Sequence, residues 1–82
     1  MKVTVILYGG LKREAGGREH VVELARERPR VVDLVDTLVD RFPALQQRLD
    51  GVAFAVNNEI VDADFILRDG DEASLLPPVS GG

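Results

Sequence analysis

The residues that can carry out chemistry are concentrated at the C-terminus of this 82-residue chain. The chain has no cysteine, which excludes disulfides, thiolate metal sites and cysteine nucleophiles. Its last residues, numbered 75–82, are Leu-Leu-Pro-Pro-Val-Ser-Gly-Gly. Proline favours an extended backbone, and the glycines Gly81 and Gly82 have no side chain, so this end can enter a narrow tunnel. We therefore expect the chemistry to take place at the terminal carboxylate of Gly82.

The prolines also mark a boundary. Proline cannot donate the hydrogen bond that a central strand requires, so Pro77-Pro78 should end the folded part of the chain. The residues from Pro77 to Gly82 can reach on the order of 20 Å at roughly 3.1–3.4 Å each. We expect a domain over residues 1–76 and an extended tail over residues 77–82.

The elements that hold this tail follow from the hydrophobic pattern. Residues 2–8 alternate and predict a strand with Val3, Val5 and Leu7 on one face. A loop should follow from Gly9, and residues 20–24 should form the return strand of a hairpin. From residue 31 the period changes to three and four, which is typical of an amphipathic helix. The positions in this stripe are Val31, Leu34, Val35, Leu38, Phe42, Leu45 and Leu49.

The ends of this helix can also be predicted. Pro43 should stop it near Arg41, leaving residues 44–49 as a short extra turn. Arg30 has no short side-chain acceptor and is a poor N-cap, although Asp33 in the first turn suits the helix dipole.

The remaining elements are short strands. Val52, Phe54 and Val56 alternate, Asn57-Asn58 indicates a tight turn, and Ile60-Val61 begins a short strand. A turn at residues 69–71 precedes a last strand over residues 72–76. The predicted fold is therefore α+β, a β-grasp (ubiquitin-like) domain with a mixed four- to five-stranded sheet and one main helix on one face.

Size and charge restrict the function classes. The chain is long enough for one domain only. A formal net charge of −4 disfavours binding to phosphate backbones, so we expect no nucleic-acid partner. We find no segment long and apolar enough to cross a membrane and no signal peptide, and we expect a cytoplasmic protein. The single histidine, His20, has no evident partners, and the aspartates between residues 62 and 71 lack a calcium-loop pattern, so we expect no metal site.

Two segments resemble a known family. Residues 67–72 (Leu-Arg-Asp-Gly-Asp-Glu) and the ending at residues 75–82 resemble the MoaD/ThiS sulfur carriers, and the resemblance covers essentially the whole chain. The Pro-Pro-Val-Ser-Gly-Gly ending is most similar to MoaD, the small subunit of molybdopterin synthase, because ThiS carriers usually lack the two prolines. The segment at residues 57–61 also fits the MoaD pattern.

The resemblance implies a specific reaction. An E1-like adenylating enzyme (MoeB-like) would use ATP to adenylate the Gly82 carboxylate, and sulfur transfer would convert it to a thiocarboxylate. The tail residues Val79, Ser80 and Gly81 would thread into the active site of a MoaE-like large subunit. There Gly82 would donate sulfur for the molybdopterin dithiolene. A heterotetramer of two carriers and two large subunits is implied. The carrier would bind no cofactor itself and would not be an enzyme on its own.

A partner surface can also be predicted. If Val3, Val5 and Leu7 face the helix, then Tyr8 and Leu76 lie on the outer face of the sheet. Together with Ile60 they should form an exposed apolar patch near the tail. The resemblance independently places partner-facing apolar residues at these three positions. It also places Lys12 where relatives carry an arginine, with Arg13 following. The alternative is that Tyr8 and Leu76 complete the core.

Three other functions stay open. The sulfur acceptor could instead belong to tRNA thiolation or to thiazole, cysteine or tungsten-pterin synthesis. The chain could be a ubiquitin-like protein modifier, although its only lysines, Lys2 and Lys12, disfavour chain building. It could also be a plain binding module without terminal chemistry.

Overall fold

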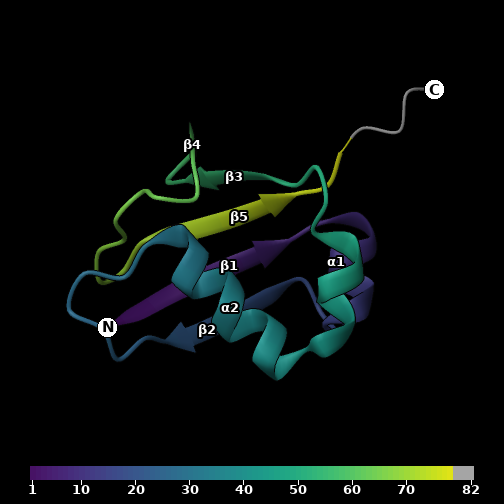
Figure 1. Ribbon diagram of the computed structural model, residues 1–82, viewed down its shortest axis with the longest axis horizontal. Coiled ribbons are helices and arrows are strands. Elements are labelled where there is room, and N and C mark those ends of the chain that lie inside the picture. Colours follow the sequence, from purple (N-terminus) through teal and green to yellow (C-terminus); the bar gives the residue numbers. More distant parts are fainter. Residues whose placement is uncertain (79–82) are drawn as a thin grey trace.

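The protein is a β-grasp domain with one mixed sheet and a helix packed across one face (Figure 1). The computed structural model describes residues 1–78, so the predicted reactive residue Gly82 and the preceding three residues lie outside the described part. In chain order the elements are β1 (Lys2–Leu7), α1 (Gly9–Glu14), β2 (Glu19–Glu23), α2 (Val31–Arg41), the 3₁₀ helix η1 (Pro43–Arg48), β3 (Ala53–Val56), β4 (Glu59–Val61) and β5 (Glu72–Leu76). The predicted fold class is confirmed.

The first and last strands lie side by side in the middle of the sheet. The strand order is β2-β1-β5-β3-β4, with β1 and β5 parallel and the other neighbouring pairs antiparallel. The return strand β2 begins and ends one residue earlier than predicted. Because β5 is hydrogen-bonded on both sides, the segment that leads into the tail is anchored at the centre of the fold.

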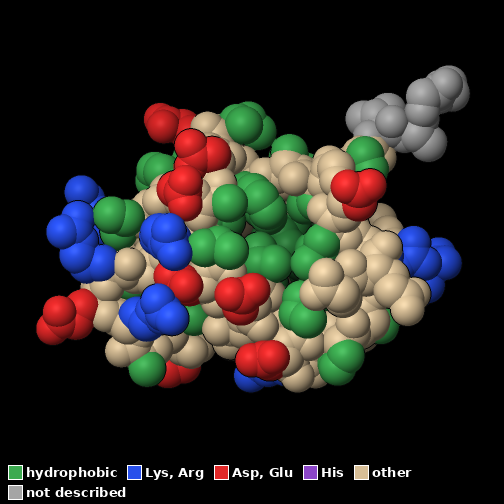
Figure 2. Space-filling view, in the orientation of Figure 1, with side chains coloured by type: hydrophobic (Ala, Val, Ile, Leu, Met, Phe, Trp, Pro, Cys, Tyr) green, Lys and Arg blue, Asp and Glu red, His purple; other side chains and the backbone are tan. Residues whose placement is uncertain are grey.

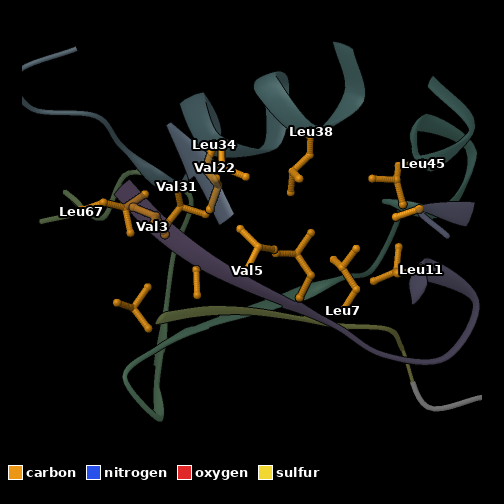
Figure 3. Packing of buried hydrophobic residues seen from close by; sticks show 14 of the residues in the cluster. Val3, Val5, Leu7, Leu11, Val22, Val31, Leu34, Leu38, Leu45 and Leu67 are labelled. Carbon is orange, nitrogen blue, oxygen red and sulfur yellow. The ribbon is translucent and has the colours of Figure 1, made fainter. Parts of the chain in front are cut away.

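The core lies between this sheet and α2. Val3, Val5 and Leu7 are fully buried on the face of β1 that was predicted to meet the helix. Leu34 and Leu38 project from α2 toward them (Figure 3). Burying each such leucine stabilises the fold by about 1.5–3 kcal/mol relative to leaving it exposed.

Helix α2 has the predicted bounds, but its N-terminus is capped in a way that the sequence did not predict. It ends at Arg41, just before Pro43, as a proline requires. Arg30 provides no side-chain cap, but Asp33 Oδ2 accepts a hydrogen bond from the Arg30 backbone N–H at 2.8 Å. The free N–H groups of the first turn are bound by a distant segment, since Val31 N–H donates to the Phe65 carbonyl at 2.9 Å. A loop far along the chain therefore caps the helix.

The segment after β1 differs from the prediction. A loop was expected from Gly9, but residues 9–14 form the short helix α1. Leu11 is 1% exposed, and its burial against the core outweighs the low helix propensity of the two glycines before it. Glu14 also accepts a hydrogen bond from Arg48 Nε at 3.0 Å, which joins α1 to η1.

The described residues show neither a membrane span nor a metal centre. Within residues 1–78, no helix has the length and hydrophobicity needed to cross a bilayer. In the same part of the chain, histidine and acidic side chains do not gather in groups of three that could hold a metal ion.

Candidate functional site

The tail begins at the end of a central, largely buried strand. In β5, Ala73 and Leu75 are 2% and 1% exposed, and Leu76 pairs with Ala53 of β3. Pro77 and Pro78 follow directly. The predicted reactive Gly82 and the predicted threading residues lie outside the described part of the chain, so their roles remain predictions; the threading residues are Val79, Ser80 and Gly81.

The outer face of the sheet, opposite α2, is built from rows of side chains that the register aligns. One row crosses four strands through Ile6, Ser74, Ala55 and Ile60. The next row toward the tail contains Leu76 beside Ala53, with Tyr8 following β1 in the same alternation. We call these two rows the tail-side surface; its members are Ile6, Tyr8, Ala53, Ala55, Ile60, Ser74 and Leu76.

The tail-side surface is uncharged. Charged side chains surround it: Lys2 and Glu23 share one row farther from the tail, and Glu72 lies in another. Glu19 stands at the outer end of the Ile6 row, and Arg18 lies beside Tyr8. An uncharged surface rimmed by charges is the composition found at the centre of protein–protein interfaces. The arrangement therefore supports the prediction that a partner docks beside the tail.

The predicted contact residues Tyr8, Leu76 and Ile60 do share this face. Tyr8 is 36% exposed and Ile60 is 71% exposed, whereas Leu76 is half-buried. The alternative that Tyr8 and Leu76 complete the core is wrong, because neither belongs to the buried cluster or packs against it. The helix-facing side chains of β1 already fill that space. The contact role itself stays a prediction.

Arg18, to which no sequence pattern pointed, borders the tail-side surface beside Tyr8. Its guanidinium carbon lies 5.4 Å from the centre of the Tyr8 ring, in the range of a cation–π interaction. Its carbonyl accepts a hydrogen bond from Leu7 N–H at 2.7 Å, which extends the β1–β2 ladder by one step. Only the register of this hairpin brings Arg18 to Tyr8, and a hairpin with a long loop leaves that register open in the sequence.

The predicted basic residues lie on α1, at the tail end of the molecule (Figure 1). Lys12 and Arg13 are both exposed in the last turn of this helix. Neither forms an ion pair with another residue of the described range 1–78. That these two residues contact a partner stays a prediction.

The opposite face has a different character. Figure 2 shows the helix-bearing side, where acidic and basic side chains are spread around a hydrophobic area that lies between α2 and β3. Val35 of α2 and Phe54 of β3 are both half-buried and pack against the core cluster.

Within residues 1–78, the tail-side surface itself contains no Asp, Glu, His, Lys or Arg. Its one hydroxyl-bearing residue on the sheet is Ser74, which lies between Ile6 and Ala55 in its row. Among residues 1–78 no polar or charged side chain is buried.

Comparison with known proteins agrees with this description. The family model described as "ThiS family" matches residues 5–82. The molybdopterin synthase sulfur carrier subunit of Chlamydomonas reinhardtii is 33% identical over 85 residues and covers all of both chains. The crystal structure of SAMP1 from Haloferax volcanii has a TM-score of 0.91 at 31% identity and also covers both chains completely. A complex of subunits 1 and 2 of the molybdopterin-converting factor from Helicobacter pylori contains a chain with a TM-score of 0.70 at 28% identity, again with full coverage of both chains.

Proposed function

This chain belongs to the ThiS family, and on that basis we propose that it is a sulfur carrier that acts as the small subunit of a molybdopterin synthase. One observation supports this most strongly. The fold anchors a strand at the centre of the sheet, and that strand runs directly into a tail ending in Gly81-Gly82. Full-length similarity to a molybdopterin synthase sulfur carrier subunit favours a molybdopterin precursor as the molecule that accepts the sulfur.

The chemistry uses the terminal carboxylate. A free carboxylate is a poor electrophile, so an E1-like enzyme first joins it to AMP from ATP and releases pyrophosphate. A sulfur donor then displaces AMP and leaves a thiocarboxylate on Gly82. Sulfur is a good nucleophile at neutral pH, and the tail delivers it to a pterin precursor. ATP belongs to the activating enzyme, and the carrier itself binds no cofactor.

A large subunit supplies the catalytic groups that the transfer of sulfur to the pterin precursor requires. The complex of subunits 1 and 2 from Helicobacter pylori shows that a related chain pairs with a second subunit. In this protein the tail-side surface is the docking face, because it is uncharged and lies beside the start of the tail. The chain is then a cosubstrate and subunit, not an enzyme alone. We place the reaction in the cytoplasm, where ATP-dependent activation takes place.

The test is the intact mass of the chain after incubation with an E1-like enzyme, ATP and a sulfur source. We expect one terminal oxygen to be replaced by sulfur. A variant lacking Gly82 should show no change in mass while unfolding at the same temperature as the full chain. Sulfur incorporation into the truncated variant, or none into the full chain with several competent activating enzymes, would contradict the proposal.

A second candidate is covalent protein modification. The likeness to SAMP1, a small archaeal modifier protein, favours it, because that structure matches this chain over its whole length. The same activated Gly82 would then form an isopeptide bond with a lysine. Mass spectrometry of a cell lysate tests this: adducts ending in the Gly82 carbonyl would support modification, and thiocarboxylate without adducts would support the carrier alone.

A further inference from the structure

The two prolines that begin the tail rest against two glycines, one at the start of α1 and one between η1 and β3. A Cβ atom on Gly9 would lie 3.3 Å from Cγ of Pro77, and one on Gly51 would lie 3.4 Å from Cβ of Pro78. Each proline ring therefore packs against main chain that carries no side chain. A side chain at Gly9 would push Pro77 away, because this spacing is tighter than ordinary van der Waals contact.

Backbone conformation gives a second reason for glycine at both positions. Gly9 has φ +57° and Gly51 has φ +77°, in the left-handed region that most residues avoid. The turn at Gly9 directs the chain from β1 into α1, and the turn at Gly51 directs it from η1 toward β3. These two turns bring bare backbone to the prolines from two directions.

A salt bridge joins the two elements that carry these turns. Arg48 of η1 lies 3.0 Å from Glu14 of α1, measured from Nε to Oε1. The Arg48 guanidinium also covers Gly10, where a Cβ atom would come within 2.8 Å of Nη1. Beneath it, Leu11 and Leu45 are buried in the same cluster. The spacing between the two glycine turns is therefore held by both charge and packing.

We infer that Gly9 and Gly51 form a seat for Pro77 and Pro78, and that this seat positions the terminal carboxylate for activation. The inference rests on the proposed function. Proline has a fixed φ, so two seated rings set the direction in which the chain leaves Pro78. Gly9 and Gly51 are thus positioning residues, because they act on Gly82 through the prolines.

The test replaces the seat glycines by asparagine, which tolerates positive φ. The chain itself holds Asn57 and Asn58 at φ 49° and 72°. The double variant Gly9→Asn/Gly51→Asn fills the seat. The matched control is Gly16→Asn/Gly70→Asn, because these glycines have φ +71° and +86° but no atom within 4 Å of a Cβ.

We expect the seat variant to lose about tenfold or more in kcat/KM for thiocarboxylate formation, mostly in kcat, since small misplacements of a reacting group are costly. The control should stay within about twofold of the wild type. Both variants should unfold at similar temperatures. Equal activity of the seat variant and the control would overturn the positioning role.

A double-mutant cycle distinguishes seating from direct contact with the activating enzyme. The variant Pro77→Ala/Pro78→Ala removes the other half of the contact. If the glycines act through the prolines, adding Gly9→Asn/Gly51→Asn to this variant should cause no further loss. Additive losses would show that the glycines contact the enzyme and would overturn the seat.

A measurement on the isolated chain separates this inference from the proposed function. Nuclear Overhauser contacts between the α-protons of residue 9 and the Pro77 ring should be present in the wild type and the control, and should be lost from the remaining α-proton of residue 9 in the seat variant. Their absence in the wild type would overturn the seat alone. Contacts without any thiocarboxylate formation would instead overturn the proposed function and, with it, the positioning role.

Discussion

Asn57 and Glu72 hold each other by two reciprocal hydrogen bonds. The Asn57 backbone N–H donates to the Glu72 carbonyl at 2.9 Å, and the Asn57 side-chain oxygen accepts the Glu72 N–H at 3.0 Å. The Asn57 amide nitrogen also donates to Asp71 Oδ1 at 3.0 Å. Glu72 begins β5, so a residue of the β3–β4 turn fixes the start of the strand that carries the tail at its other end.

Replacing Asn57 should therefore cost more than replacing its neighbour. Asn57→Ala and Asn58→Ala both put alanine at positive φ, but only Asn57→Ala also removes two hydrogen bonds. We expect Asn57→Ala to lower the free energy of unfolding by about 1–2 kcal/mol more than Asn58→Ala, as two partly exposed bonds would. Urea denaturation measures both. Equal losses would show that the side-chain bonds add nothing.

The core between α2 and β1 should dominate stability. Leu38 is 1% exposed in the middle of this contact. We expect Leu38→Ala to lower the free energy of unfolding by about 2–5 kcal/mol, because a buried cavity remains. The exposed Asp36 lies on the same helix, and Asp36→Ala should change stability by no more than about 0.5 kcal/mol. A small loss at Leu38 would mean that the core collapses around the cavity.

Tyr8 should matter for partner binding and little for folding. We expect Tyr8→Ala to weaken binding to the large subunit by about tenfold or more, as truncating a central aromatic residue does. Phe65→Ala is the matched control, because Phe65 is an aromatic residue of similar exposure, at 39% against 36%, outside the tail-side surface. Isothermal titration calorimetry measures both. If the two variants bind equally, the tail-side surface is not the interface.

Ile60 tests the far edge of the same surface. Ile60→Asp puts a charge on a side chain that is 71% exposed, so the fold should tolerate it. We expect weaker binding to the large subunit by about tenfold or more, since a charge would lose its water in the interface. Val21→Asp is the control; Val21 is 57% exposed on the same face, but lies in a row farther from the tail. Comparable binding by Val21→Asp and Ile60→Asp would place the interface elsewhere.

The long elements could be predicted because their signals are local. The apolar stripe from Val31 to Leu38 repeats at helical spacing. Pro43 ends the helix whatever the helix packs against, because the effect of a proline is local. Asn57-Asn58 predicts a left-handed turn for the same reason, and both residues do have positive φ. The short helix α1 was missed because two glycines begin it, and its stability comes from burying Leu11 in a core that residues far along the chain complete.

The amino-acid sequence alone determined which residue types this protein has available: two prolines, the pair Gly81-Gly82 shortly after them, and no cysteine. It also determined the alternation that separates the two faces of the sheet. Only the tertiary structure decided that Ile60 is aligned with Ile6, that Arg18 covers Tyr8, and that Gly9 and Gly51 meet the prolines. The physical reason is that residue types and periodicity are properties of neighbouring residues, whereas register and packing join residues far apart and are set only when the sheet assembles.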